Sequence, residues 1–159
     1  MSEPYEEILS GRTVTRSSPG SRHEQICGRL HERIQASVAD LATTRLLGRR
    51  EQVKLPPDSV LRPDLALITT ATGKLWLAAE IVDSNDHRID TVHKKQLYEE
   101  SRIPRLWMID PRYDNVEVYY GGEYGLMLKG ILAGREILSE SLLPEFQITV
   151  DELFRMQTS

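Results

Sequence analysis

Apolar residues recur at nearly helical spacing between residues 22 and 46, which predicts a long amphipathic helix with one buried stripe. The stripe consists of Ile26, Leu30, Ile34, Val38 and Leu41. Ser21 and Glu24, which are three positions apart, predict a capping box where this helix begins.

After Gly48 the pattern shortens into strand-like runs that are separated by Pro, Gly and Asp. Strands are expected at Gln52–Leu55, Leu61–Thr69, Leu75–Val82 and Arg105–Asp110, in a hairpin of Val116–Tyr120 and Tyr124–Lys129, and at Arg135–Leu138. A second helix is expected over Asp86–Ser101, with Ile89, Val92 and Leu97 on its inner side, and a short helix over Val150–Met156 closes the chain.

This order of elements predicts an α/β (α+β) fold, in which a mixed sheet has a helix on either side. The chain has 159 residues, of which 40% are hydrophobic and 28% are charged, as is typical of one globular domain. Residues 1–159 are therefore expected to form a single domain, in which residues 1–20 are an N-terminal arm that could add an edge strand. The same composition excludes collagen-like, disordered and disulfide-dense proteins.

Charge is distributed unevenly along the chain. The net charge of −4 excludes a global basic field that would hold a polyanion. Residues 12–54, however, contain nine basic and four acidic residues, whereas residues 135–159 contain two basic and five acidic residues. The basic segment could follow a DNA backbone, and it is equally compatible with ordinary solvated charges on a helix. Its arginines include Arg29, Arg33, Arg45, Arg49 and Arg50.

Cysteine usage and apolar runs exclude several further classes. The one cysteine, Cys27, cannot form an internal disulfide, and the His and Cys spacing of a zinc site is absent. The first residues do not resemble a signal peptide, and the longest apolar run, Leu75–Val82, is too short to cross a bilayer. A cytoplasmic location without membrane contact is expected.

Two acidic residues in strand-like runs are candidate metal ligands. Glu80 lies inside an apolar run, where an unpartnered carboxylate would cost several kcal/mol. Asp64 opens the preceding run, so neighbouring strands would bring both carboxylates to one point. Together with the backbone carbonyl of Ile81 they would suit Mg²⁺. The alternatives are a salt bridge for Glu80 and capping of backbone amides for Asp64.

Three more polar residues have ordinary structural interpretations. Asp90 and Lys94 are four apart on the second predicted helix, away from Ile89 and Val92, as expected for a surface ion pair. His23 in the first turn of the first helix is typical of a solvated or capping residue.

Taken together, these residues resemble the Uma-type family of putative restriction endonucleases, within the PD-(D/E)XK nuclease superfamily. The resemblance spans most of the chain, and its motifs are individually weak but ordered. They are Ser18-Pro19-Gly20-Ser21-Arg22-His23, Arg62-Pro63-Asp64, Ala79-Glu80-Ile81-Val82, Asp90 with Lys94 and Tyr98, Ile103-Pro104-Arg105-Leu106-Trp107-Met108-Ile109-Asp110-Pro111, and Leu143-Pro144-Glu145-Phe146 through Glu152-Leu153-Phe154.

The resemblance implies a restriction-endonuclease-like core with an additional C-terminal β-hairpin. It implies that Asp64 and Glu80 bind Mg²⁺ or Mn²⁺ and that Lys94 and His23 join them in a phosphodiesterase site. In the superfamily motif a lysine follows the glutamate by two positions, but this chain has Val82 there, so Lys94 must supply the ammonium. Asp83 stands where the family usually has Ser, and it could add a third carboxylate or, as we favour, cap the second helix.

The function expected from this resemblance is metal-dependent endonuclease activity on DNA. The alternatives are a catalytically inactive module of the same fold that binds nucleic acid or a protein partner, and a hydrolase that acts on another substrate. A homodimer is expected, since two sites would cut two strands. Four tyrosines around the predicted hairpin could form a dimer contact or stack bases, although cross-strand packing is commoner. They are Tyr113, Tyr119, Tyr120 and Tyr124.

Overall fold

The computed structural model describes residues 3–83 and 85–156, so the ends of the predicted 1–159 domain lie outside the described residues. In chain order the elements are β1 (Tyr5–Leu9), β2 (Arg12–Arg16), α1 (Ser21–Val38), β3 (Thr44–Leu46), β4 (Val53–Leu55), β5 (Ser59–Leu61), β6 (Leu65–Thr69), β7 (Leu75–Ile81), a π-helix η1 (Ile89–Lys94), α2 (Lys95–Glu100), β8 (Arg105–Asp110), β9 (Asn115–Gly122), β10 (Gly125–Ala133), β11 (Ile137–Glu140), β12 (Leu143–Thr149) and α3 (Val150–Phe154).

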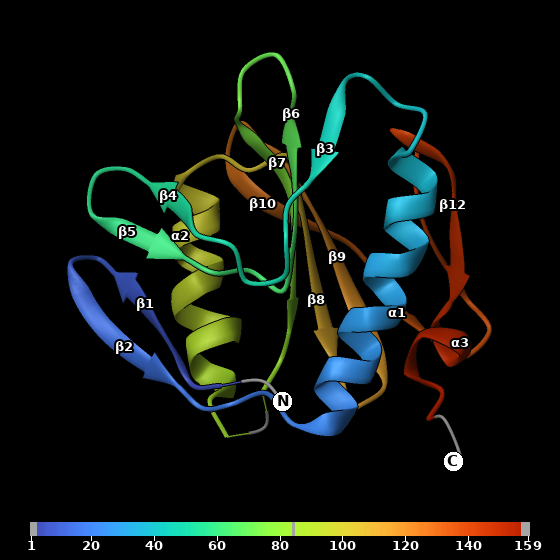
Figure 1. The fold of residues 1–159 in the computed structure, drawn as a ribbon, viewed down its shortest axis with the longest axis horizontal. Helices are drawn as coiled ribbons and strands as arrows, with labels where there is room; N and C mark the ends of the chain where they lie inside the picture. Colours follow the sequence, from blue (N-terminus) through green and yellow to red (C-terminus); the bar gives the residue numbers. More distant parts are fainter. Residues whose placement is uncertain (1–2, 84, 157–159) are drawn as a thin grey trace.

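The largest sheet is mixed, as the order of elements predicted. Its strands lie in the order β10-β9-β8-β7-β6-β3, and all neighbours are antiparallel except β7 and β8. Parallel neighbours need a crossover, and here it is formed by η1 and α2. Figure 1 shows α1 on one side of this sheet and α2 on the other. The predicted arrangement of a mixed sheet between helices is therefore confirmed.

A smaller antiparallel sheet packs beside α2 and contains the N-terminal hairpin. Its order is β2-β1-β5-β4, so β2 is an edge strand (Figure 1). β1 pairs with β5 through Ile8 and Val60. Because β5 precedes β6 by only three residues, this pairing connects the N-terminal hairpin to the strand that follows Asp64.

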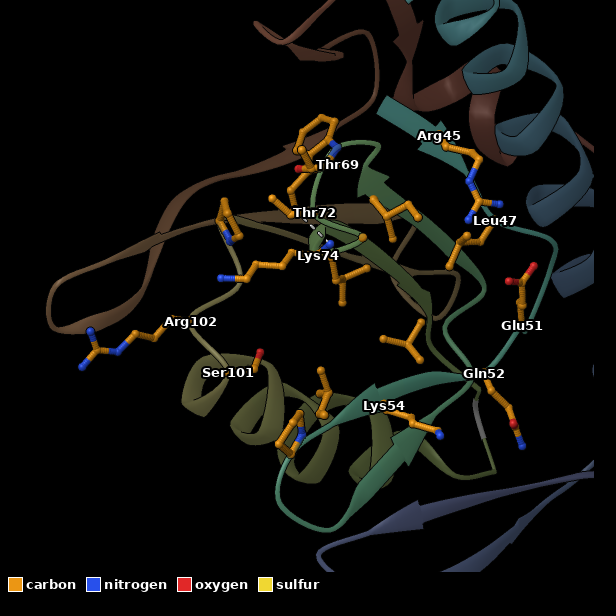
Figure 2. A pocket seen from close by; sticks show the side chains of 18 residues that line it. Arg45, Leu47, Glu51, Gln52, Lys54, Thr69, Thr72, Lys74, Ser101 and Arg102 are labelled. Atoms are coloured by element: carbon orange, nitrogen blue, oxygen red, sulfur yellow. Dashed lines mark hydrogen bonds between the residues drawn. The ribbon is translucent and has the colours of Figure 1, made fainter. Parts of the chain in front are cut away.

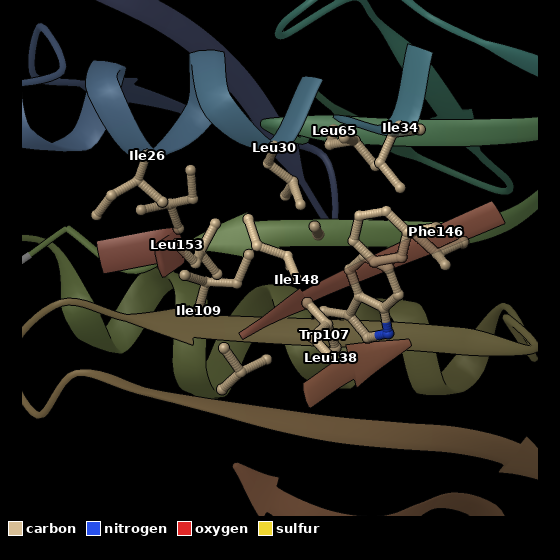
Figure 3. Close-up of a cluster of buried hydrophobic side chains, with 14 of the residues drawn as sticks. Ile26, Leu30, Ile34, Leu65, Trp107, Ile109, Leu138, Phe146, Ile148 and Leu153 are labelled. Carbon is tan, nitrogen blue, oxygen red and sulfur yellow. The ribbon is translucent and has the colours of Figure 1, made fainter. Parts of the chain in front are cut away.

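The main core lies between α1 and the large sheet (Figure 3). Ile26, Leu30, Ile34 and Val38 are all buried there, as the helical spacing predicted. Burial of such side chains stabilises the fold by about 1.5–3 kcal/mol each. On the same side of the sheet as α1, β12 and α3 add Phe146, Ile148 and Leu153, and the Phe146 ring stacks on Trp107 with centroids 5.6 Å apart (Figure 1).

The first helix differs from its prediction at both ends. It stops at Val38, and Thr44–Leu46 forms β3 on the edge of the large sheet, where the Trp76 indole donates to the Thr44 hydroxyl. Leu41 packs against the core from the connecting loop. The capping box does not form, since Gly20 is the N-cap and the Glu24 carboxylate accepts hydrogen bonds from Arg50.

The expected strand Leu61–Thr69 is two strands in different sheets. β5 ends at Leu61 and β6 begins at Leu65, on either side of Pro63, which has no N–H to donate to a ladder. The prediction of one continuous strand over Leu61–Thr69 was therefore wrong. Gln52–Leu55 and Leu75–Val82 are each confirmed to within one residue, as β4 and β7, and Arg105–Asp110 is confirmed without change.

The C-terminal region contains the predicted hairpin, with longer strands. β9 and β10 pair from Gly122 with Gly125 to Asn115 with Ala133, so the turn falls at 123–124, whereas the predicted strands left 121–123 for it. The run 135–138 contributes to β11, which pairs with β12, a strand that was not predicted. The last helix ends at Phe154 instead of Met156. No helix in the described ranges is long and apolar enough to span a membrane.

Gly121 allows β9 to pass closely over the connection between α2 and β8. A Cβ atom at this position would lie 2.0 Å from the Ile103 carbonyl oxygen, and backbone cannot move aside cheaply. We expect Gly121→Ala to destabilise the protein by about 3 kcal/mol, which lowers Tm by about 6–12 °C. Gly130→Ala, where a Cβ meets open space in β10, is the matched control in thermal denaturation followed by circular dichroism. Equal melting of the two variants would contradict this account.

Candidate active site

The pairing of β6 and β7 brings Asp64 and Glu80 together, as expected for adjacent strands. Leu65 pairs with Ala79 in this antiparallel ladder, so the preceding Asp64 falls opposite Glu80. Both side chains are buried. The site lies where β7 ends and the chain turns toward η1.

Asp64 is held by three groups around its carboxylate. Its Oδ2 accepts the backbone N–H of Ile81 at 2.8 Å, and its Oδ1 lies 2.9 Å from His23 Nε2 and 3.0 Å from Arg50 Nη1. The N–H and C=O of one strand residue point to the same edge, so the Ile81 carbonyl also faces the Asp64 side of β7. His23, Asp64 and Ile81 are thus brought together.

Glu80 shares one carboxylate oxygen between two donors. Its Oε2 lies 2.6 Å from Lys94 Nζ and accepts the Tyr98 hydroxyl at 2.5 Å. Lys94 and Tyr98 are four residues apart at the junction of η1 and α2, and both are fully buried. Lys94 therefore brings an ammonium next to Glu80, whereas Val82, at the position of the superfamily's lysine, has no charged group.

The expectation that Asp90 and Lys94 form a surface ion pair was wrong. Both are buried, and Arg16 Nη2 donates to both oxygens of Asp90 at 3.0 and 3.1 Å. Val92, expected on the inner side, is 53% exposed. The cause is the π-helix, because its i→i+5 turns present a different set of side chains to the sheet than a period of 3.6 assigns.

Glu7, Arg16 and Arg50 belong to this site and were not predicted. Glu7 Oε2 lies 2.7 Å from Lys94 Nζ, and Glu7 Oε1 accepts Arg16 Nη1 at 2.6 Å. Arg50 joins Asp64 to Glu24. The available sequence signal was weak, since Glu7 lies in an acidic N-terminal run and both arginines lie in a basic segment that was assigned to solvent or DNA.

The charges in the site shift its pKa values in opposite directions. Burial raises the pKa of Asp64, but the charge and hydrogen bond of His23 and the Ile81 N–H outweigh burial and hold it well below its usual range. Burial is also the largest influence on Glu80; Lys94 opposes it, Asp64 and Asp90 reinforce it, and the pKa of Glu80 rises to about 8.

The two bases of the site keep their protons more strongly than usual. Burial lowers the pKa of Lys94, yet the carboxylates of Glu80 and Glu7 raise it above its ordinary value. Likewise, burial lowers the pKa of His23, and Asp64 raises it further than burial lowers it. Lys94 is therefore an ammonium at neutral pH.

The donor atoms near Asp64 and Glu80 fit a hard divalent cation. Within residues 3–83 and 85–156, no three His, Cys, Asp or Glu side chains form a group that could hold a metal ion. Mg²⁺ commonly binds through one or two carboxylates and retains several waters, which two carboxylates and one carbonyl would allow.

Asp83 does not join the carboxylates. Its Oδ1 accepts the N–H of Asn85, and its own N–H donates to Asp90 Oδ2. These bonds shape the turn before η1, which begins at Ile89 rather than at Asp86. The favoured prediction that Asp83 caps the second helix was therefore wrong, since the N-cap of η1 is Arg88 and Asp83 accepts a hydrogen bond in the turn before it.

A cleft of about 440 Å³ lies beside the site. His23, Val82 and Asp83 line it together with Arg22 and Arg112, and the start of α1 and the loop after β8 complete its walls. A larger pocket, about 1080 Å³, lies elsewhere, against the end of β6 and the start of β7 near α2 (Figure 2). None of the candidate site residues lines this larger pocket, whereas His23 lines the smaller cleft.

Most arginines of the basic segment are engaged within the chain. Arg29 donates to the carbonyls of Glu152 and Leu153, and Arg33 contacts Glu152 as well. Arg49 lies 3.9 Å from Glu24, which also holds Arg50. These contacts fix α1 and its neighbours, whereas Arg45 lines the larger pocket (Figure 2).

The four tyrosines do not share one environment. Tyr119 is buried with Lys95 over its ring at 4.4 Å, and Tyr120 stacks with Arg105 at 3.7 Å. Tyr113 and Tyr124 are exposed. The two strand tyrosines are packing residues, and the homodimer stays a prediction.

Comparison with known proteins gives one family and one fold. The family model Uma2, described as putative restriction endonuclease, matches residues 2–151. The chain is also similar in structure to a crystal structure of a putative nuclease belonging to DUF820 from Anabaena variabilis ATCC 29413. The TM-score is 0.79 at 16% sequence identity, and the match covers 96% of this chain and 90% of the other. No curated protein is significantly similar to the chain.

Proposed function

Because the chain belongs to the Uma2 family of putative restriction endonucleases, we propose that it is a metal-dependent endonuclease that hydrolyses phosphodiester bonds in DNA. The fold it shares with a putative nuclease is compatible with this activity. Fold alone does not identify a reaction, so the proposal depends on the site.

The observation that carries the proposal is the convergence of Asp64, Glu80 and Lys94 in one buried cluster. Strand pairing places the two carboxylates opposite each other, and the crossover returns Lys94 to within 2.6 Å of Glu80. Burying such charges is costly, and perturbed carboxyl groups beside a cleft are typical of functional sites.

Asp64, Glu80 and the Ile81 carbonyl would hold a Mg²⁺ or Mn²⁺ ion. When bound, such an ion would act as a Lewis acid that offsets negative charge on the scissile phosphate. Both contacts of Glu80 go to Oε2, which leaves Oε1 outside them. The protein's own part is to hold these oxygens in place, through the Ile81 N–H, His23 and Tyr98.

Lys94 would stabilise charge that develops during hydrolysis. An ammonium has three N–H donors, and its nitrogen lies 2.6 Å from Glu80 and 2.7 Å from Glu7 as an ion pair. One of its N–H groups would donate to the attacking water or to a phosphate oxygen. A buried, fixed donor of this kind contributes more than one in water, because it needs no reorganisation.

The cleft beside the site would give the phosphate a route to these groups. Arg22 and Arg112 line it, and His23 extends from it to Asp64. Guanidinium groups bind phosphate through several N–H donors at once. His23 would contact the phosphate or keep Asp64 oriented.

The test is Mn²⁺ titration by calorimetry combined with cleavage of supercoiled plasmid. The unmodified protein, Asp64→Asn and Glu80→Gln are purified identically, and EDTA is added as a metal-free control. We expect saturable Mn²⁺ binding and nicking by the unmodified protein. Both should be lost in both variants, because each substitution removes a charged ligand.

Other outcomes would redirect the proposal. Mn²⁺ binding without cleavage of plasmid would support the metal site and contradict DNA as substrate. Absence of binding would favour the inactive module of the same fold. Nicking that persists in both variants would identify a contaminating nuclease and contradict the proposed site.

A further inference from the structure

The N-terminal hairpin places a buried carboxylate against Lys94. Glu7 lies in the middle of β1, is 1% exposed, and has its Oε2 2.7 Å from Lys94 Nζ. Since Glu80 Oε2 is 2.6 Å from the same nitrogen, the ammonium lies between two carboxylates. Glu80 belongs to β7 in the large sheet, whereas Glu7 belongs to β1 in the smaller sheet.

A lysine needs such a second contact to be fixed. Its ammonium is at the end of a flexible four-carbon stem, and one carboxylate defines a single distance. Two carboxylates from different sheets, at 2.6 and 2.7 Å from the nitrogen, restrict the position of the ammonium more than one carboxylate does.

Glu7 is itself held firmly. Its Oε2 accepts the backbone N–H of Arg62 at 2.7 Å, and its Oε1 accepts Arg16 Nη1 at 2.6 Å. Arg62 comes two residues before Asp64, so Glu7 is connected to the segment that presents the candidate metal ligand. Arg16 also donates a hydrogen bond to Asp90, which lies four residues before Lys94.

We propose that Glu7 is a positioning residue that fixes the Lys94 ammonium between β1 and Glu80, so that the N-terminal hairpin completes the active site. The effect of Glu7 on catalysis rests on the proposed function. Its effect on the position of the Lys94 ammonium does not depend on that function.

The test compares Glu7→Gln with Glu140→Gln. Glu140 is an equally buried carboxylate that accepts Arg105 Nε at 2.9 Å on β11, away from the site, so its variant reports the general cost of removing a buried paired charge. The Lys94 ammonium is observed by nitrogen-15 NMR near neutral pH and assigned by its disappearance in Lys94→Arg. Steady-state plasmid cleavage and Mn²⁺ affinity are measured on the same samples.

We expect a slowly exchanging Lys94 ammonium signal in the unmodified protein and in Glu140→Gln, and its loss in Glu7→Gln. We expect kcat to fall about 10- to 100-fold in Glu7→Gln, because a misplaced catalytic group costs about that much. KM and Mn²⁺ affinity should stay within about twofold, since Glu7 touches neither the cleft nor Asp64. A stability role alone would lower Tm in both variants and leave kcat of the folded protein unchanged.

Two results would overturn the inference. One is a Lys94 signal in Glu7→Gln that matches the unmodified protein. The other is that the unmodified protein cleaves plasmid and Glu7→Gln cleaves it with the same kcat. If the unmodified protein binds Mn²⁺ but does not cut DNA, the proposed function fails and the NMR comparison alone decides whether Glu7 fixes Lys94.

Discussion

Lys94→Met is expected to lower kcat for plasmid cleavage by about 10²- to 10³-fold, which is the usual cost of removing a preorganised donor from developing charge. Methionine retains the unbranched stem but has no ammonium, so Glu80 and Glu7 lose the cation at 2.6 and 2.7 Å. Mn²⁺ binding should remain, because Asp64, Glu80 and the Ile81 carbonyl are unchanged.

Lys95→Met is the control for this substitution. Lys95 is the next residue on the same helical segment, but its ammonium lies over the Tyr119 ring at 4.4 Å instead of in the site. Its kcat should stay within about twofold of the unmodified protein. Cleavage is measured with plasmid at a temperature where both variants retain their native circular dichroism. Full activity in Lys94→Met, or an equal loss in Lys95→Met, would transfer the ammonium role to Lys95 or to another base.

Arg16→Leu is expected to destabilise the protein by about 3–5 kcal/mol, which is typical when one member of a buried ion network is removed. Arg16 is 3% exposed and lies 2.6 Å from Glu7 and 3.0 Å from Asp90. Its loss leaves two buried carboxylates without this partner. For a chain of this size, Tm should fall by about 6–20 °C.

Arg12→Leu separates this effect from a general change in β2. Arg12 is on the same strand, four residues earlier, and its side chain is exposed. Urea denaturation should give the control a free energy of unfolding within about 0.5 kcal/mol of the unmodified protein. If Arg16→Leu were equally stable, the buried network would not contribute to the fold as we describe.

The local pattern of apolar residues was sufficient to predict the helices and strands in which buried positions recur regularly. The spacing of Ile26, Leu30 and Ile34 located α1 because a helix buries one stripe. The apolar runs of β7 and β8 located the central strands because both faces of the sheet are covered. Boundaries shifted where a proline or a pairing partner intervened, as at Pro63 and at Thr44 in β3.

Local pattern failed in η1 because its helical period is different. Asp90 and Lys94 have the spacing of an exposed ion pair on an α-helix. In the π-helix both are buried, while Val92 is exposed. Burial of a charged residue depends on whether other elements supply partners, and those partners are Arg16, Glu7 and Glu80.

The amino-acid sequence by itself determined the family, the mixed sheet between helices, and the residues Asp64, Glu80, Lys94 and His23 as candidates. It could do so because strand and helix periods are local and because the ordered motifs run along the chain. Only the tertiary structure decided that Glu7 and Arg16 from the N-terminal hairpin and Arg50 from a loop meet those candidates. Their contacts span up to 87 residues along the chain, as between Glu7 and Lys94, and a charge pairing of that separation leaves no periodic trace in a single sequence.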